Sequence, residues 1–260
     1  MPVSNDWMRP VVAVIQARMS STRLPGKVMR EVAGKTILGH VVDRLKAAAR
    51  IDTVIVATTT DPSDDCIEAW CAGRNVPVYR GSMNDVLDRY YEAARKFSAK
   101  TVVRVTSDCP LIDPELVDMI IEKFSLGGLD HVSVGPTYPD GLDAEVFSFT
   151  ALKKAHREAR LGSEREHVTP YIWKNPGTFR IARITSEKDL SKLRWTVDDE
   201  KDLTLVTRIY EGMGPGLFHL NDVLEYLERN PGLSDINSMT MRNEGYAKSL
   251  REDVTVEKAG

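Results

Sequence analysis

The chain has 260 residues, of which 35 are Lys or Arg and 38 are Asp or Glu, so its formal net charge is -3. This balance argues against a protein that holds nucleic acid through bulk positive charge. The sequence has no run of about 18 apolar residues and no basic start followed by an apolar stretch, so we expect neither a membrane span nor a secretory signal. Its three cysteines include no CxxC pair, which is typical of a reducing compartment, and we expect a cytoplasmic protein.

Short apolar runs alternate with amphipathic segments over about the first 125 residues. Strands are predicted, in chain order, at 11–15, 53–59, 76–79 and 101–106. Helices are predicted between and after them, at 37–48, 63–71, 85–97 and from 113 onward. Strands that alternate with helices predict an α/β fold with a mostly parallel sheet flanked by helices.

Irregular connections separate the elements of the second half. Strands are predicted at 131–134, 144–149, 179–184 and 194–197, and a turn is predicted at 137–142. Helices are predicted at 150–160, 164–174, 200–210 and 221–229. The tail from Ser234 is polar and lacks a clear apolar period. We therefore predict one domain over residues 1–260, with a core over about 10–230, an elaborated second half and a polar tail over 234–260.

The loop after the first predicted strand carries the clearest chemical signal. Residues 16–27 read QARMSSTRLPGK and place Arg18, Arg23 and Lys27 beside three hydroxyl side chains. Ligands of open α/β sheets bind beyond the carboxyl ends of the strands, and cations, hydroxyls and backbone amides together suit a polyphosphate. The glycine patterns of the Rossmann dinucleotide site and of the P-loop are missing, which disfavours a dehydrogenase and a P-loop ATPase. A solvated basic turn is the alternative for this loop.

Residues 15–27 (IQARMSSTRLPGK) resemble the signature loop of the sugar-acid cytidylyltransferases, the family of the CMP-KDO and CMP-acylneuraminate synthetases. Further segments extend the resemblance over about residues 10–210 and indicate the spore-coat polysaccharide biosynthesis branch: 80–82, 85–89, 107–112, 138–141, 164–167 and 194–198. The resemblance implies a Rossmann-like nucleotidyltransferase fold with an acceptor-binding portion in its second half. It also implies a reaction in which CTP and a sugar acid give a CMP-sugar and pyrophosphate, and homodimers are usual among such relatives.

Two aspartates stand at the ends of predicted strands, where they could share one hard cation. Mg²⁺ prefers one or two carboxylates together with phosphates and water. The resemblance implies that Asp108 matches the family's magnesium-binding Asp in Gly-Asp-x-Pro-Leu, with Ser107 in place of the usual Gly. Asp198 likewise matches a metal-binding Asp in a late Val-Asp segment. A turn or N-cap role is the alternative for Asp108, and a helix cap is the alternative for Asp198.

The resemblance also implies which residues bind the metal, which bind the nucleotide and which take part in catalysis. The candidate metal ligands are Asp108 and Asp198, and the candidate catalytic residues are Arg18, Lys27, Asp108 and Asp198. The candidate nucleotide-binding residues are Ala17, Arg18, Ser21, Arg23, Lys27, Ser82 and Asp108. The three cations of the loop would steady the triphosphate and the departing pyrophosphate.

Candidate acceptor-binding residues lie in the second half. Alternation along a strand would place Asp143 and Glu145 on one face, where they and Asp140 could hydrogen-bond a polyhydroxylated acceptor. Arg165 or His167 could meet the carboxylate of that acceptor. A charged turn and a helix whose first turn favours acids are the alternatives for these two groups.

We therefore predict a Mg²⁺-dependent cytidylyltransferase that uses CTP and a small sugar-acid acceptor, without nucleic acid or membrane partners. A nucleotide-sugar-dependent glycosyltransferase is one alternative, although Ser107-Asp108-Cys109 does not supply the Asp-x-Asp metal motif common in such enzymes. A non-catalytic nucleotide-binding protein is the other alternative. The presence of both candidate metal carboxylates argues against it.

Overall fold

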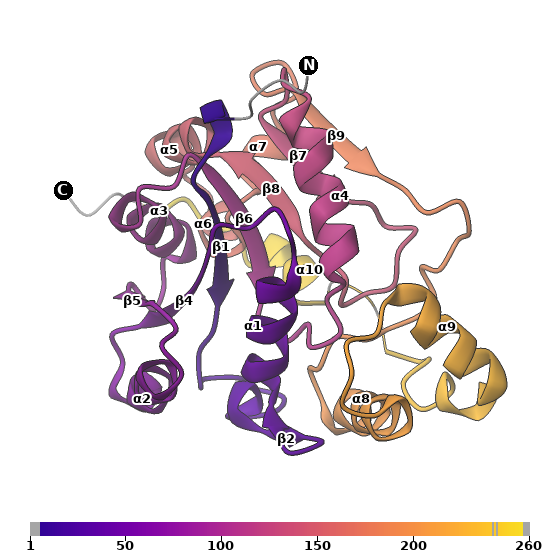
Figure 1. The fold of residues 1–260 in the computed structure, drawn as a ribbon. Coiled ribbons are helices and arrows are strands. Elements are labelled where there is room, and N and C mark those ends of the chain that lie inside the picture. The colour runs from indigo at the N-terminus through magenta and orange to yellow at the C-terminus, as the bar shows by residue number, and fades with distance from the viewer. Residues whose placement is uncertain (1–5, 241, 243, 257–260) are drawn as a thin grey trace.

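A seven-stranded sheet runs through the molecule, with helices on both faces (Figure 1). The computed structural model describes residues 6–240, 242 and 244–256. The strand order is β5-β4-β1-β6-β8-β7-β9, and a two-stranded ribbon pairs β2 with β3. The strands are β1 (Val11–Gln16), β2 (Glu31–Val32), β3 (Lys35–Thr36), β4 (Thr53–Thr59), β5 (Val78–Gly81), β6 (Thr101–Thr106), β7 (His131–Val134), β8 (Glu145–Ser148) and β9 (Ile181–Ile184).

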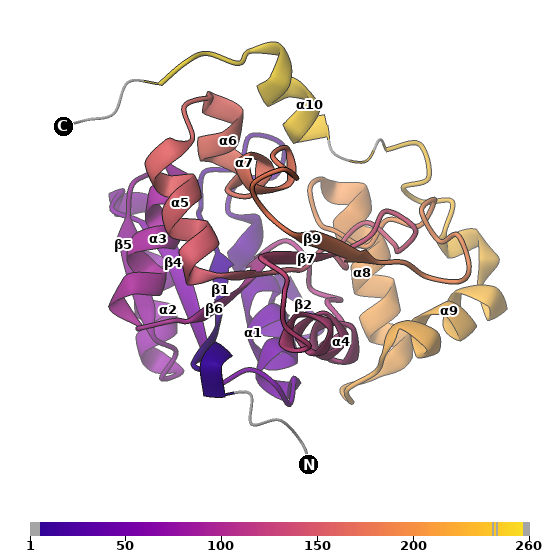
Figure 2. The same ribbon diagram turned by 90° about the horizontal axis from the view of Figure 1, so that it is seen from above.

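The helices follow the predicted order, with one addition near the C-terminal end of the described residues. They are α1 (Ile37–Ala47), α2 (Asp65–Gly73), α3 (Val86–Lys96), α4 (Pro114–Ser125), α5 (Phe149–Glu158), α6 (Gly162–His167), α7 (Pro170–Trp173), α8 (Glu200–Met213), α9 (Leu220–Arg229) and α10 (Glu244–Arg251). Short 3-10 turns are η1 (Asp6–Met8), η2 (Lys27–Met29), η3 (Pro62–Asp64) and η4 (Pro231–Leu233). The addition is α10, which forms within the polar tail and packs beside α6 (Figure 2).

The direction of the strands fixes where a ligand can bind. β1 pairs in parallel with β4 on one side and with β6 on the other, and β4 pairs in parallel with β5. The chain therefore builds outward from β1 to β5 and then crosses to β6 on the opposite side of β1. Such a switch of direction leaves a crevice at the carboxyl ends of the two central strands. The parallel part of the sheet confirms the predicted α/β class, while β8 pairs antiparallel with β6 and β7.

The core lies on both faces of this sheet, which explains why the central strands read as continuous apolar runs. Alternate residues of β1 enter different clusters. Ala13 and Ile15 pack with residues of α1, α4 and α8, whereas Val12 and Val14 pack with residues of α3 and α5. The two helical layers hold the strand ends in place, and the loops beyond those ends carry the polar side chains described below.

Residues 194–197 do not form a strand, so this prediction is wrong. Trp195 and Val197 are buried as the pattern suggested, but the segment makes only an isolated bridge between Arg194 and Asp140. It is extended because it lies against turns instead of a strand. The Trp195 backbone N–H donates to the Asp140 carbonyl at 2.6 Å, and the Val197 N–H donates to the Asp108 carbonyl at 2.8 Å.

The helix predicted at 164–174 is two helices, α6 and α7. Val168 interrupts it with a left-handed backbone, φ 73°, and Pro170 opens the second helix at a position that suits proline. The strand predicted at 76–79 lies two residues later, because Pro77 precedes the first paired residue, Val78. Both differences concern local backbone rules and leave the order of the elements unchanged.

No helix in residues 6–240, 242 and 244–256 is long and apolar enough to cross a bilayer. The predicted cytoplasmic location and the single-domain organisation remain predictions.

Candidate active site

A cleft of about 930 Å³ opens at the carboxyl ends of β1 and β6. Its lining comes from the loop after β1, the loop before α3, the end of β6 and the start of α6. Asp198 and the segment of α10 complete the lining. The cleft therefore occupies the switch point that the strand order creates.

A lysine joins the two predicted metal carboxylates in this cleft. The Lys27 ammonium donates to Asp108 Oδ2 at 2.8 Å, to Asp198 Oδ1 at 2.8 Å and to the Val197 carbonyl at 2.9 Å. Lys27 is buried, whereas the Asp108 and Asp198 side chains are 25% and 20% exposed. The structure thus brings together three predicted catalytic residues that are 81 and 171 positions apart along the chain.

The loop after β1 folds so that Lys27 reaches these carboxylates. The N–H groups of Ser21 and Gly26 both donate to the Met19 carbonyl at 2.9 Å, which closes the loop on itself. Gly26 has φ 68°, a left-handed backbone that favours glycine. The short helix η2 begins directly after it, at Lys27. The Pro-Gly-Lys ending of the motif is therefore the bend that turns Lys27 inward.

Electrostatics hold Asp108 ionised. Burial alone would raise the pKa of Asp108, but the Lys27 ammonium and the Thr106 hydroxyl lower it to about 2. Burial opposes the charge on Lys27 too, and the carboxylates of Asp108 and Asp198 overcome it and raise the pKa of Lys27. Both groups are therefore charged at neutral pH. Asp108 is too weak a base to take a proton there, and it suits a cation instead.

Arg194 orients Asp198 and was not anticipated from the sequence. Its guanidinium donates to Asp198 Oδ2 at 2.8 Å, to both oxygens of Asp202 at about 3 Å, and to Asp140 at 2.5 Å. The buried Asp202 carboxylate also accepts from the Asp198 N–H at 2.9 Å. The sequence did contain a signal for this pairing, because Arg194 stands four residues before Asp198. The prediction of a strand at 194–197 concealed it. Asp198 is therefore held by buried partners, and the helix N-cap is Asp199.

The other predicted nucleotide residues lie in or beside the cleft. Ala17, Arg18, Ser21 and Arg23 line it, whereas Ser82 does not and uses its hydroxyl to accept from the Asp85 N–H at 3.0 Å. Among the described residues, no carboxylate forms an ion pair with Arg18. Arg23 bonds Asp198 and Glu244, both at 2.9 Å. The loop thus offers the cleft one unpaired guanidinium and one shared between two carboxylates.

Of the predicted acceptor residues, the structure brings only His167 to the cleft. Arg165 is buried and bonded to Asp85. Asp140 bonds Arg194, and Asp143 pairs with Arg242 at 2.7 Å. Glu145 accepts from Arg104 at 2.7 Å, from His131 at 3.0 Å and from Thr169 at 2.8 Å. None of these four side chains lines the cleft, and each is already bonded to another side chain of the protein.

Sequence reasoning missed several residues that do line the cleft. Arg104 lines it from β6 while pairing with Glu145. Arg89 lines it from α3, with its guanidinium donating to the Ser82 carbonyl at 2.9 Å. The segment of α10 supplies Glu244 and Lys248. The contribution of α10 could not be predicted, because the polar tail from Ser234 has no apolar pattern that indicates a helix.

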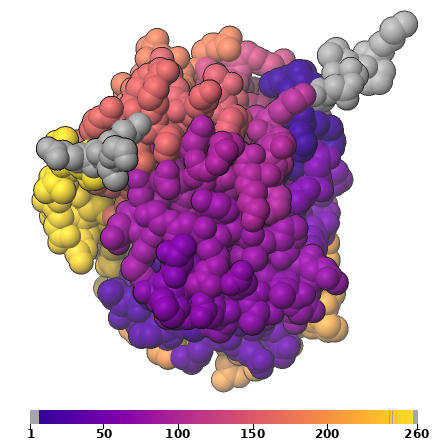
Figure 3. All heavy atoms as spheres, turned by 90° about the vertical axis from the view of Figure 1, so that its left-hand side faces the viewer, coloured from indigo at the N-terminus to yellow at the C-terminus, as the bar shows by residue number. Residues whose placement is uncertain are grey.

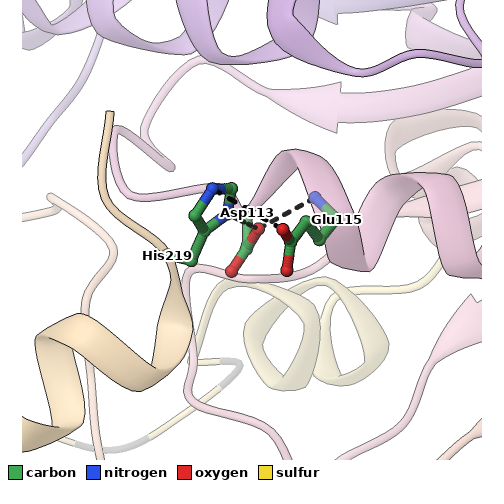
Figure 4. Close-up of side chains that lie close together, drawn as sticks. All are labelled: Asp113, Glu115 and His219. Atoms are coloured by element: carbon green, nitrogen blue, oxygen red, sulfur yellow. Dashed lines mark hydrogen bonds and ion pairs between the residues drawn. The ribbon is translucent and has the colours of Figure 1, made fainter. Parts of the chain in front are cut away.

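A second group of ligand-type side chains lies away from the cleft, where Asp113, Glu115 and His219 turn toward one another (Figure 4). One oxygen of Asp113 caps α4 by accepting from the Glu115 N–H at 2.9 Å, and the other accepts from the Leu220 N–H at 2.6 Å at the start of α9. His219 Nδ1 lies 3.0 Å from the first oxygen. Helix capping therefore accounts for this cluster.

Comparisons with known proteins agree with the geometry. The sequence profile of the cytidylyltransferase family matches residues 12–228. The spore coat polysaccharide biosynthesis protein SpsF of Bacillus subtilis is 31% identical over 86% of this chain and 96% of its own length. A 3-deoxy-manno-octulosonate cytidylyltransferase of Anaeromyxobacter dehalogenans is 38% identical over 80% and 93%. A solved cytidylyltransferase of Leptospira borgpetersenii is 34% identical with a TM-score of 0.84, over 90% of this chain and 99% of that one.

Proposed function

Because this chain belongs to the cytidylyltransferase family and is a CTP-dependent nucleotidyltransferase, we propose that it transfers CMP to a sugar acid and uses Mg²⁺. The acceptor hydroxyl forms a bond to the α-phosphorus of CTP as the bond to the departing pyrophosphate breaks. Such a transfer depends on positioning and on charge neutralisation more than on covalent chemistry by the protein.

The observation that carries the proposal is the convergence of Asp108, Asp198 and Lys27 beside a cationic loop. The two carboxylates come from the end of β6 and from the segment before α8, and Lys27 comes from the loop after β1. Carboxylates suit a hard cation, and cations suit phosphate oxygens. The cleft thus has the two kinds of group that a metal-bound triphosphate requires.

The carboxylates fit a divalent cation by their chemistry and access. Asp108 and Asp198 each place an oxygen 2.8 Å from the same nitrogen, so both oxygens face one point, and both side chains are partly exposed. Mg²⁺ bound there would neutralise phosphate charge and lower the pKa of the acceptor hydroxyl. Thr106 holds the other oxygen of Asp108 through its hydroxyl, which keeps that carboxylate oriented.

The loop cations would bind the triphosphate. Arg18 is exposed in the cleft and has no ion-pair partner among the described residues. Lys27 and Arg23 would exchange carboxylates for phosphate oxygens when the nucleotide enters. The closed backbone of the loop around Met19 and Gly26 fixes the positions from which these side chains reach.

Pyrophosphate release tests the proposed acceptor and metal together. With CTP and Mg²⁺, we expect release in the presence of 2-keto-3-deoxy sugar acids and none with neutral sugars of the same size. Release with neutral sugars alone would refute the acceptor class, and full activity in excess EDTA would refute the metal.

Stabilisation by CTP but not by UTP, ATP or GTP is expected in thermal melts, because a ligand at 100 times its Kd adds about 2.7 kcal/mol.

Asp108→Asn tests the role of the first carboxylate. We expect loss of turnover with retention of the folded circular dichroism spectrum, because the amide keeps the shape but removes the charge that holds a cation. Asp43→Asn is the matched control, since Asp43 pairs with Lys35 on the surface. A folded Asp108→Asn protein with near-normal turnover would contradict the assignment.

A further inference from the structure

One wall of the cleft is built by a segment that sequence patterns leave unassigned. Glu244, Gly245, Lys248 and Ser249 of α10 and Glu252 just beyond it line the cleft. Their spacing of three and four residues places them on one face of the helix. α10 lies beside α6 and α7 in Figure 2, and Figure 3 shows this C-terminal segment, in yellow, against the edge of the molecule.

The wall is attached to the rest of the site by specific contacts. The Ser249 hydroxyl lies 3.0 Å from His167 Nε2 and donates to Glu166 at 2.7 Å. Asp253 accepts from the N–H and the hydroxyl of Ser163 at 2.9 and 2.7 Å. At the other end of α10, Glu244 accepts from Arg23 at 2.9 Å. α10 is thus fixed both to α6 and to the phosphate-binding loop.

Among the described residues of α6 and α10 that line the cleft, Lys248 is the one cation that can receive an anionic group. Arg165 of α6 is committed to Asp85. Burial, the first of several causes, lowers the pKa of His167 below its ordinary 6.5, so the imidazole is neutral at pH 7. Lys248 lies one helical turn, about 6 Å along the axis, from Glu244, and no carboxylate pairs with it among the described residues.

We propose that Lys248 binds the carboxylate of the acceptor and that α10 is the acceptor-selecting wall of the cleft. The inference rests on the proposed function, and it assigns the acid group of the acceptor to a residue of the C-terminal segment. Arg18, Arg23 and Lys27 belong to the loop that receives the triphosphate. The carboxylate of the acceptor would therefore pair with Lys248 on the opposite wall. Ser249 and His167 would form hydrogen bonds with the hydroxyl groups of the acceptor.

Kinetics of Lys248→Gln and Lys248→Arg test this assignment, with Arg251→Gln as the matched control. Arg251 is on the same helix and is exposed outside the cleft. For Lys248→Gln we expect the acceptor KM to rise about ten- to hundredfold, the loss expected for a hydrogen bond to a charged group. The kcat and the Kd for CTP should change less than about threefold. Lys248→Arg should restore most of the acceptor affinity, and Arg251→Gln should match the wild type.

A carboxamide analogue of the acceptor gives a second readout. The wild type should bind the analogue as weakly as Lys248→Gln binds the acid, and Lys248→Gln should no longer distinguish acid from amide. An unchanged acceptor KM in Lys248→Gln would overturn the inference. Equal weakening of CTP and acceptor would also overturn it, by placing Lys248 on the triphosphate. If the wild type released no pyrophosphate with any sugar acid, the proposed function would fall and this inference with it, whereas turnover by the wild type isolates a failure of Lys248 alone.

Discussion

Replacing Lys27 by methionine would remove the cation that holds two carboxylates together. Asp108 and Asp198 would then face each other without the ammonium that now lies 2.8 Å from both. The lowering of the Asp108 pKa from 3.8 to about 2 corresponds to roughly 2 kcal/mol. The Thr106 hydroxyl supplies part of this effect, and the bonds of Lys27 to Asp198 and Val197 add to it. We therefore expect Lys27→Met to lower the free energy of unfolding by about 2–3 kcal/mol at pH 7.

The pH dependence of this loss identifies its cause. Asp108 has a lowered pKa in the folded state, so its contribution is complete well above pH 3.8 and disappears as the pH falls toward 2. Lys27 has a raised pKa, so its contribution is complete below pH 10.5 and is lost at higher pH. The difference between wild type and variant should therefore be constant from about pH 5 to pH 9 and should fall to about half at pH 3.

Urea denaturation at pH 7, 5 and 3 measures the difference directly. Lys35→Met is the matched control, because Lys35 makes a surface pair with Asp43 at 2.5 Å and such pairs contribute about 0–1 kcal/mol. For a chain of this size a loss of 2–3 kcal/mol lowers Tm by roughly 5–10 °C. Equal stability of Lys27→Met and wild type at pH 7, or a difference that does not shrink at pH 3, would refute the reasoning.

Two further predictions concern the segments that position the site. Asp113→Ala should lower the free energy of unfolding by about 1–3 kcal/mol, because the two carboxylate oxygens of Asp113 cap α4 and α9. Urea denaturation measures this loss. A loss no greater than that of the control variant Glu115→Ala would contradict the capping role. Gly141→Ala should cost about 2–4 kcal/mol, because Gly141 has φ 101° and an added Cβ would lie 2.4 Å from the Thr196 nitrogen. Gly216→Ala is its control, since nothing lies within 4 Å there, and equal Tm values for the two variants would refute the steric account.

The sequence predicted the parallel half of the fold and the place of the loop after β1 well, for a physical reason. Strands buried on both faces read as apolar runs, and the helices between them show one apolar face. Once β1 and β6 are placed in parallel, the loop after β1 and Asp108 must meet at the same edge of the sheet. Local patterns therefore determine this part of the site.

The rest depends on polar contacts between distant residues, which leave no local pattern. Arg194 pairs with Asp140, which is 54 residues away. This pairing holds residues 194–197 as an extended segment outside the sheet, where the sequence predicted a strand. The docking of α10 rests on Ser249 with His167 and on Asp253 with Ser163, pairs 82 and 90 residues apart. Charged residues such as Asp143 and Arg165 looked available for a ligand, but their partners could be identified only in the folded chain.

The pair between Arg23 and Glu244 spans 221 residues, and this span matters while the chain is being made. At a synthesis rate of about 5–20 residues per second, roughly 10–45 seconds separate the two residues at the ribosome. The loop cations are complete long before Asp198 and Glu244 exist to pair with them. In a nascent chain Arg23 therefore does not have both of its carboxylate partners, Asp198 and Glu244, until synthesis has reached α10.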